Sequence, residues 1–270
     1  MTMKWAAVAM AGILLGSSFA GSAKADGVLD EVKKRGQLVV GNKTDFAPFG
    51  ALNASGEPAG FEIDLARDVA KRLGVELKIV PVVSANRMQF LQQGKIDLMI
   101  ATMSYRPERA EAVEVVQPAY YASAQSLLAP KNASPKLTAW EDLRDKKVCG
   151  VQGAFYNADV AAFGAQIVNF KDTTEALNGL KDGKCVGMAF DITFFAGKLQ
   201  EPEWAAYELP LPSRNDDPWV LAVKKGETAF HEYMVGVVKD WHKTGKLIEL
   251  EGTWKLPASS FLKAQKEKNS

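Results

Sequence analysis

The chain has 270 residues, of which 47% are hydrophobic and 24% are charged, and its formal net charge is +1 at pH 7. This length is enough to bury one large core or two modest cores. A charge balance this close to zero gives no sign of a nucleic-acid partner or of an anionic membrane surface, so we expect no nucleic acid to bind.

The first 25 residues have the composition of a secretory leader. Lys4 precedes the short apolar run AAVAMAGILLGSSFA, and Ala23 and Ala25 are small residues at the positions that a signal peptidase reads. The run is too short and too rich in Gly and Ser for a transmembrane helix, although an uncleaved anchor is the alternative. We expect cleavage after Ala25, which leaves a soluble periplasmic protein that begins at Asp26.

Strands and helices are predicted to alternate in the first part of the mature chain. Buried strands are expected at 37–42, 75–83 and 96–102, with helices at 60–74 and 85–95 between them. This order indicates a parallel sheet with right-handed crossovers.

The same pattern then restarts, which predicts a second α/β unit in tandem with the first. Its expected elements are a short helix at 139–146, a strand at 147–153, a helix near 156–164, a strand at 166–170, a helix at 173–184 and a strand at 185–191. Two extended apolar segments, 123–131 and 217–226, are expected to connect the lobes, and a helix at 228–244 to return to the first lobe. We therefore divide the chain into lobe 1 (26–124 and 217–256), lobe 2 (125–216) and a mobile polar tail (257–270).

Cys149 and Cys185 are the two cysteines of the chain. In an oxidising compartment such a pair forms a disulfide more often than not, and neighbouring strands would bring the two Cα atoms within reach. The alternative is a pair of buried, reduced side chains. There is no CxxC motif, and His231 and His242 lie far away in a helical stretch, so we expect no metal site and no cofactor.

Polar side chains follow the predicted strands, at the sheet edge where open parallel sheets bind ligands. These residues are Lys43, Thr44, Asp45 and Phe46 after the first strand, Thr102, Ser104 and Arg109 after the apolar run 96–100, Gln152 and Gly153 after 148–151, and Asp191 after 186–190. If the two edges face each other, these residues line one cleft between the lobes.

The segment IATMSYRPERA, residues 100–110, has the chemistry of an anion site. Thr102 and Ser104 are small enough for backbone N–H groups and hydroxyls to face a ligand, and Pro107 suits the first turn of a helix. Arg109 can then add a bidentate contact to a carboxylate. The alternative for Arg106 and Arg109 is a solvated pair on a surface loop.

The chain resembles the polar amino-acid-binding proteins of ABC importers, which are family 3 solute-binding proteins. The resemblance rests on VVGNKTDFAPF, GFEIDLARDVAKRLG, LQQGKIDLMIATMSYRPERA and PAYYASAQSLLA, and later on EDLRDKKVCGVQG, FDITFFAG and VLAVKKG, so it covers roughly Val28 to Trp254. It implies the periplasmic-binding-protein type II fold, with two α/β lobes joined by a two-strand hinge and a ligand cleft between them.

The resemblance also implies roles for single residues. Ser104 and Arg109, with the Thr102 backbone beside them, would hold the α-carboxylate of an L-amino acid, and Asp191 would hold its α-ammonium. Asp191 could instead be a plain helix cap. The first loop of lobe 2 departs from the family, because QGAFYN stands where a Gly-Ser/Thr pair is usual; Gly153 and Ala154 would still offer backbone N–H groups.

Because Lys43 and Arg87 are basic, we expect the site to prefer a ligand with an acidic side chain. Relatives that bind aspartate and glutamate resemble this chain in having basic residues at both positions, and two cations beside an apolar wall call for an anionic partner. Phe46 would pack over the aliphatic part of the ligand, or belong to the core. The alternative for Lys43 is an ion pair with Asp45 or a position in solvent.

The expected function is therefore capture of an L-amino acid, glutamate or aspartate first, and its delivery by a monomeric protein to an ABC transporter permease. Two other functions stay open. One is an enzyme on the same fold, such as a cyclohexadienyl dehydratase, although no catalytic set stands out in the sequence. The other is a chemosensory ligand-binding module.

Overall fold

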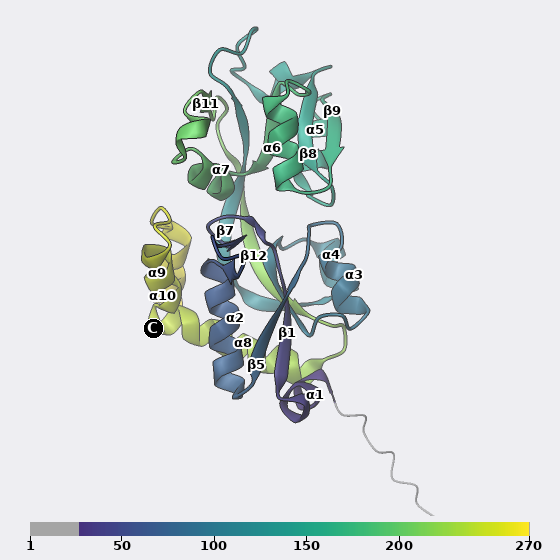
Figure 1. Cartoon of the computed structure of the whole chain (residues 1–270), viewed down its shortest axis with the longest axis vertical. Coiled ribbons are helices and arrows are strands. Elements are labelled where there is room, and N and C mark those ends of the chain that lie inside the picture. The colour runs from purple at the N-terminus through teal and green to yellow at the C-terminus, as the bar shows by residue number, and fades with distance from the viewer. Residues whose placement is uncertain (1–26, 270) are drawn as a thin grey trace, which may run out of the picture.

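The computed structural model describes residues 27–269, and two long strands organise this part of the chain. Strands β7 (Glu114–Pro130) and β12 (Arg214–Val223) run side by side from the lower lobe into the upper lobe (Figure 1). The two connections predicted at 123–131 and 217–226 are thus parts of paired strands. The predicted lobe boundaries fall inside β7 and β12 and stay a prediction.

Lobe 1, the lower half of Figure 1, is built on the strand order β5-β1-β6-β12-β7. Strand β1 pairs in parallel with β5 and β6, and β12 is antiparallel to β6 and β7. The remaining elements of this lobe flank the sheet. The bounds are α1 (Val28–Arg35), β1 (Gln37–Asn42), α2 (Phe61–Leu73), β5 (Glu76–Pro81), α3 (Arg87–Gln92), β6 (Leu98–Ser104), α4 (Pro107–Ala112), α8 (Thr228–Thr244) and α9 (Lys246–Thr253).

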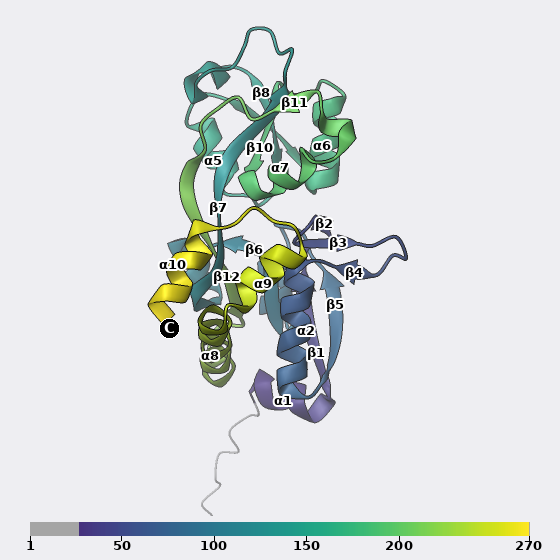
Figure 2. The ribbon, with the colours of Figure 1, turned by 90° about the vertical axis from the view of Figure 1, so that its left-hand side faces the viewer.

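A small three-stranded sheet projects from lobe 1, as Figure 2 shows. It consists of β2 (Asp45–Phe46), β3 (Gly50–Leu52) and β4 (Pro58–Ala59). No sequence pattern predicts this sheet, because its strands are only two or three residues long. It matters for the site because β2 begins two residues after Lys43.

Lobe 2 continues the sheet in the order β7-β10-β8-β9. Strands β10, β8 and β9 are parallel to one another, and β10 is antiparallel to β7. The bounds are η1 (Trp140–Leu143), β8 (Lys147–Val151), α5 (Tyr156–Ala161), β9 (Gln166–Phe170), α6 (Thr173–Lys181), β10 (Gly187–Asp191), α7 (Ile192–Lys198), η2 (Pro202–Trp204) and β11 (Tyr207–Glu208). The predicted helix at 139–146 is a single 3-10 turn.

Helix α2 shows how the sequence pattern produces these elements. Phe61, Leu65 and Val69 recur at helical spacing and are fully buried, which is the driving force for packing this face against the sheet. The helix ends at Gly74, where φ is +69° and the N–H group bonds back to the carbonyl of Ala70. Glycine adopts this left-handed cap without the steric cost of a Cβ atom, so the predicted stop is confirmed.

The predicted disulfide is confirmed in lobe 2. Cys149 on β8 is bonded to Cys185, just before β10, and the two Cα atoms are 5.5 Å apart. The strands are parallel neighbours, with Met188 opposite Cys149. The bridge therefore links two strands of one sheet across a sequence separation of 36 residues.

The C-terminal segment differs from its prediction. The sequence predicts a mobile polar tail, whereas the structure places Ser260–Asn269 in helix α10, with Leu262 buried in the core of lobe 1. Leu262 and Phe261 are the apolar residues that anchor this otherwise polar helix. Composition alone does not predict such a helix, because only one or two apolar residues anchor a segment that is otherwise polar.

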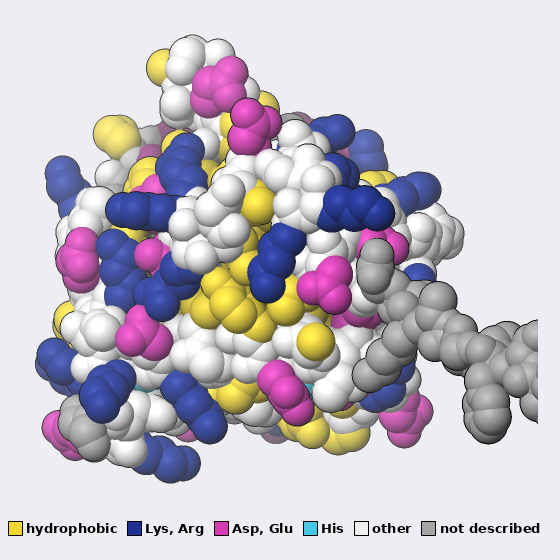
Figure 3. All heavy atoms as spheres, turned by 90° about the horizontal axis from the view of Figure 1, so that it is seen from below, with side chains coloured by type: hydrophobic (Ala, Val, Ile, Leu, Met, Phe, Trp, Pro, Cys, Tyr) yellow, Lys and Arg dark blue, Asp and Glu magenta, His cyan; other side chains and the backbone are white. Residues whose placement is uncertain are grey.

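Charges of both signs cover the end of lobe 1 that is farthest from lobe 2. Figure 3 shows hydrophobic side chains gathered near the middle of this face, with Lys and Arg side chains around them and Asp and Glu side chains interspersed. This face therefore has no single-sign field.

The sequence makes two predictions about membranes and export: that the mature chain has no membrane span, and that it is preceded by a cleaved leader. Between residues 27 and 269, no helix has both the length and the apolar character that a membrane span requires. The predicted leader and its cleavage after Ala25 lie outside the described residues.

Candidate functional site

The ends of the strands in the two lobes meet at a small cavity of about 10 Å³. Its lining includes six of the predicted site residues, together with four that were not predicted. The lining residues are Ser84, Arg87, Thr102, Ser104, Arg109, Ala154, Phe155, Tyr156, Phe190 and Asp191. A volume this small holds one water at most, so the lobes are closed on each other in this structure.

Arg109 spans the closed cleft from lobe 1 to lobe 2. Its Nη1 donates to the carbonyl oxygen of Ser104 at 3.0 Å, and its Nη2 donates to the carbonyl oxygen of Gly153 at 3.1 Å. Burial and the adjacent Arg106 cation lower the pKa of Arg109. A cation held in this way, at the start of helix α4, is suited to a carboxylate.

Gly153 lies where the backbones of the two lobes approach closely. A Cβ atom at this position would lie 2.7 Å from backbone atoms of Ala85, and φ is +81°. Only glycine meets both conditions. The N–H group of Ala154, predicted to be free for a ligand, instead donates to the carbonyl oxygen of Val151 at 3.0 Å and closes a turn.

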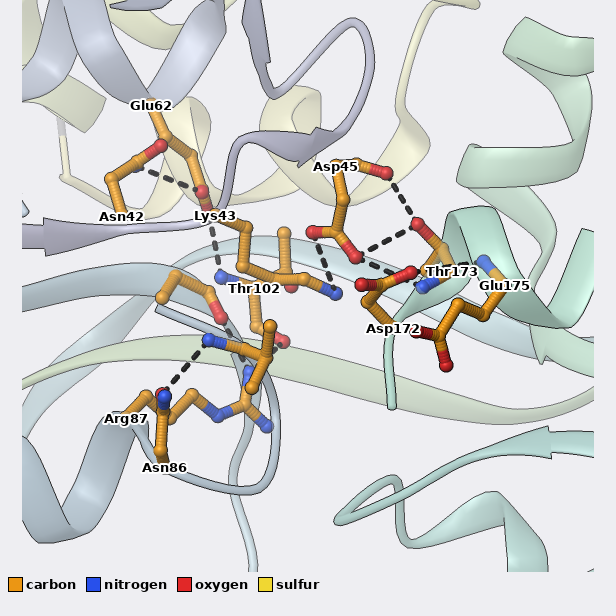
Figure 4. Close-up of polar contacts among 12 residues, drawn as sticks. Asn42, Lys43, Asp45, Glu62, Asn86, Arg87, Thr102, Asp172, Thr173 and Glu175 are labelled. Carbon is orange, nitrogen blue, oxygen red and sulfur yellow. Dashed lines mark hydrogen bonds and ion pairs between the residues drawn. The ribbon is translucent and has the colours of Figure 1, made fainter. Parts of the chain in front are cut away.

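Thr102 has a strained backbone that two buried side chains hold in place (Figure 4). Its φ of +45° is unusual for a β-branched residue. Its N–H group donates to Glu62 Oε1 at 2.7 Å, and its carbonyl oxygen accepts from Arg87 Nη1 at 3.1 Å. A strained backbone residue that neighbouring side chains hold through both its N–H group and its carbonyl oxygen is typical of a functional site.

Glu62 is a site residue that the sequence analysis missed. Its carboxylate is fully buried and also accepts from the Tyr120 hydroxyl and from Asn42 Nδ2, the latter at 3.3 Å. Burial raises the pKa of Glu62. Its spacing could have revealed that it is buried, because Ala66 and Val69 follow at i+4 and i+7 on the buried face of α2.

Arg87 is nearly fully buried, at 3% exposure, and begins helix α3. Its Nη1 also donates to the carbonyl oxygen of Ala101, while its buried Nε has no hydrogen-bond partner among the described residues. Burial and the Arg109 cation lower the pKa of Arg87 to about 9. The site therefore holds a guanidinium whose hydrogen-bonding capacity is only partly used.

Lys43 is fully buried, which is rare for lysine. Its Nζ lies 3.7 Å from Asp45 Oδ1, and 4.7 Å and 5.1 Å from the ring centroids of Phe46 and Phe190. Within residues 27–269 this Nζ has no hydrogen bond, and burial lowers its pKa. The ion pair with Asp45, which the sequence left as the alternative, is present. Because the Phe190 ring lines the cavity, Lys43 lies behind its wall.

Phe46 packs between the lobes. Its ring centroid is 5.5 Å from that of Phe190 and 5.0 Å from that of Phe194, both in lobe 2, and 5.7 Å from those of Phe49 and Trp219. Phe46 does not line the cavity, so in the closed form it serves the aromatic core that joins the lobes.

Asp45 makes a polar contact across the lobes, on the right of Figure 4. Its Oδ2 accepts from the N–H group of Thr173 at 3.0 Å and from the Thr173 hydroxyl at 2.8 Å. Burial acts to raise the pKa of Asp45, but Lys43 and the bonds from Thr173 outweigh it and hold the pKa below its usual value. Lobe 1 is thus tied to the first residue of helix α6 in lobe 2.

We expect Thr173→Val to weaken ligand binding about tenfold, because a hydrogen bond to a charged group that forms only on closure contributes about 1.5 kcal/mol. Calorimetric titration of the variant measures this. Thr174→Val, at the exposed next residue, is the matched control. Unchanged affinity in Thr173→Val would show that this contact does not contribute to closure.

Asp191 is buried, at 4% exposure, at the end of β10. Its Oδ1 accepts from the Tyr156 hydroxyl at 2.6 Å. Burial raises the pKa of Asp191 to about 6, although Tyr156 and Lys43 oppose this rise. Its side chain makes no cap bond to helix α7, so the alternative of a plain helix cap has no support in the geometry.

Tyr156 and Phe155 come from the QGAFYN loop, whose departure from the family pattern was the one signal that could have found them. Ser84 and Phe190 were also missed. Ser84 lies in the loop between β5 and α3, and Phe190 occurs one residue before Asp191, on a buried strand. Neither position carries a sequence pattern that separates it from a loop or from the core.

The described residues contain no group of three or more His, Cys, Asp or Glu side chains that could hold a metal ion.

Comparison with known protein families decides the class of protein. Residues 38–257 match the family described as bacterial extracellular solute-binding proteins, family 3. The chain belongs to this family. A curated relative, the ABC transporter glutamine-binding protein GlnH of Bacillus subtilis, is 33% identical over 233 residues, which is 84% of each chain.

Solved structures agree with this assignment. Holo ArgBP from T. maritima has a TM-score of 0.76 and 29% identity, over 83% of this chain and 98% of that one. The ancestral amino acid-binding protein AncCDT-1, a precursor of cyclohexadienyl dehydratase, has a TM-score of 0.77 and 30% identity, over 84% of this chain and 98% of that one. The α/β fold of the type II periplasmic binding proteins is therefore confirmed. These relatives are named as binding proteins and not as enzymes, in agreement with the expectation from the sequence.

Proposed function

We propose that this family 3 protein captures a polar L-amino acid between its lobes in the periplasm and presents it to the permease of an ABC importer. The observation that carries the proposal is the pairing of Arg109 from lobe 1 with Asp191 from lobe 2 at one cavity. A zwitterion has one group for each: the α-carboxylate for Arg109 and the α-ammonium for Asp191. The B. subtilis relative is named as the binding protein of an ABC transporter, which supports the permease as partner.

Binding must couple to opening and closing of the lobes. The closed cavity of about 10 Å³ cannot admit an amino acid, so the lobes have to separate before a ligand enters. Residues of both lobes then contact the ligand, which favours the closed form by binding it more tightly than the open form.

Within the amino acids, we propose an acidic side chain, glutamate or aspartate. The buried cations Lys43 and Arg87 each keep a nitrogen without a hydrogen-bond acceptor among residues 27–269. A side-chain carboxylate in the cavity would accept a hydrogen bond from Arg87, which lines it, and would be attracted by the charge of Lys43 behind the Phe190 wall. An unpaired buried donor costs about 1–3 kcal/mol, and more when it is charged.

Glutamine is the second candidate, and one observation favours it. The Nζ of Lys43 already has Asp45 as an ionic partner at 3.7 Å, and the anion Glu62 lies close to both cations. These carboxylates balance the two cations, so a neutral amide side chain would complete the site without adding charge. The B. subtilis relative named above is a glutamine-binding protein.

A thermal-shift screen against the twenty amino acids tests the general proposal. A ligand at one hundred times its dissociation constant adds about 2.7 kcal/mol of stability, which is readily measured. If none of the twenty shifted the melting temperature, amino-acid capture would be wrong.

For specificity, we expect L-glutamate to bind more tightly than L-glutamine, and L-arginine to be rejected by like-charge repulsion. Lys43→Met should weaken glutamate binding about tenfold, because the attraction of a buried cation just behind the Phe190 wall is lost, and should change glutamine binding less. Calorimetry measures both, with Lys95→Met, at an exposed lysine, as the control. Glutamine or arginine binding as tightly as glutamate would end the acidic proposal and leave amino-acid capture standing.

A further inference from the structure

Arg106 lies next to the proposed site and has no part in the function described so far. Its guanidinium Cζ lies 3.5 Å from the ring centroid of Phe155, on the QGAFYN loop of lobe 2. Its Nη2 donates to Asp217 Oδ1 at 2.5 Å. Asp217 lies on the hinge strand β12 with its side chain fully buried. Arg106 thus contacts lobe 2 and the hinge at once.

Tyr156, the residue after Phe155, connects this contact to Asp191. It is 2% exposed, and its hydroxyl donates to Asp191 Oδ1 at 2.6 Å. The same hydroxyl interacts electrostatically with Asp217, whose buried Oδ2 has no hydrogen-bond partner among the described residues. Burial keeps the pKa of Tyr156 well above its usual value, so the hydroxyl keeps its proton.

Two carboxylates therefore compete for one donor, because a tyrosine hydroxyl carries a single proton. Arg106 biases the competition, because it balances the charge of Asp217 and bonds its Oδ1, so that Oδ2 alone is left as the competing acceptor. The Tyr156 proton is then left for Asp191, which fixes one carboxylate oxygen and leaves the other for a ligand cation.

We propose that Tyr156 is the positioning residue of Asp191, and that Arg106 controls it through Asp217 as the lobes close. Arg106 comes from lobe 1, Asp217 from the hinge, and Phe155 and Tyr156 from lobe 2, so the full contact forms only in the closed molecule. The contact aligns Asp191, which would hold the ligand ammonium, when the lobes close. A ligand that lacks an α-ammonium group would therefore bind weakly. The inference rests on the proposed function, in which Asp191 holds that ammonium.

Tyr156→Phe tests the first step, because it removes only the hydroxyl. The full-length mature protein is titrated calorimetrically with L-glutamate, L-glutamine and L-arginine, and the tightest of the three serves as the probe. Its affinity should fall about tenfold in Tyr156→Phe. Tyr207→Phe, which alters a tyrosine of lobe 2 outside the cavity, is the matched control and should leave the affinity unchanged.

The pH profile separates positioning from a merely structural role. Binding requires ionised Asp191, so affinity should fall as the pH drops through about 6. The Tyr156 hydroxyl favours the ionised form, and its loss should therefore move this decline to higher pH. The other charged groups that face Asp191 stay in place in this variant; they are Lys43, Arg87, Arg109 and Asp217.

A double-mutant cycle tests the control by Arg106. Arg106→Gln should weaken binding severalfold in the parent protein and much less in Tyr156→Phe, because its effect passes through the hydroxyl. Asp217→Asn, which removes the competing charge, should restore part of the affinity lost in Arg106→Gln. Arg67→Gln, at an exposed arginine of α2, is the control.

The outcomes distinguish the inference from the function on which it rests. Wild-type affinity and an unshifted pH profile in Tyr156→Phe, with binding lost in Asp191→Ala, would overturn the inference alone. Wild-type affinity in Asp191→Ala would overturn the ammonium anchor itself. Additive effects in the cycle would show that Arg106 acts independently of Tyr156.

Discussion

Arg109→Ala and Asp191→Ala should each weaken amino-acid binding by about 2 kcal/mol or more, which is roughly thirtyfold in the dissociation constant. Each variant leaves one charge of the zwitterion buried in the closed cleft without its partner. For Arg109 the loss includes the bond to Gly153, which helps to hold the lobes together. Calorimetric titration with the amino acid that gives the largest thermal shift measures both variants.

The controls for this experiment remove surface charges of the same kind. Arg67→Ala alters a 54% exposed side chain on α2, and Asp182→Ala alters a 58% exposed side chain at the end of α6. Both should bind as the parent protein does. N-acetylated and decarboxylated forms of the ligand should fail to bind the parent protein. Asp191→Ala with parental affinity would contradict the assignment of Asp191 to the ammonium.

Loss of the Cys149–Cys185 disulfide should lower the free energy of unfolding by up to about 4 kcal/mol. The bridge closes a loop with a sequence separation of 36 residues, and on the chain-entropy model the unfolded chain gains that much conformational freedom without it. Urea unfolding of the Cys149→Ala/Cys185→Ala double variant measures the change.

Reduced parent protein is the control for packing, because it keeps both sulfur atoms in the buried sheet of lobe 2. It should lose most of the same stability. Thiol titration of the unfolded, unreduced protein should find no reactive thiol. Two reactive thiols, or equal stability of the oxidised and reduced protein, would contradict this account.

The backbone plan of the protein could be predicted from its sequence because the signals for it are local. Alternating apolar runs, a helix stop at Gly74 and the bounds of β9 and α8 follow from spacing and from capping residues. The parts that were missed had weak local signals. The strands β2 to β4 are too short to show alternation, and two apolar residues anchor α10, which otherwise has a polar composition.

The candidate site also has a part that the sequence predicts and a part that it does not. Arg109 and Asp191 could be found because they follow strand ends, and parallel sheets place all such ends at one edge. The contacts between lobes could not be found, because the closed arrangement alone brings Arg106 onto Phe155 and Asp45 onto Thr173.

The sequence by itself therefore determined two α/β lobes, their two connections and the residues at the strand ends, since each depends on short-range periodicity. The tertiary structure decided which of these residues share a cavity and which lie behind its wall. Lys43 shows the difference: its position after β1 suggested contact with a ligand, yet packing places it behind Phe190 with Asp45 as its partner. Burial and pairing depend on residues far apart in the chain, and no local pattern encodes them.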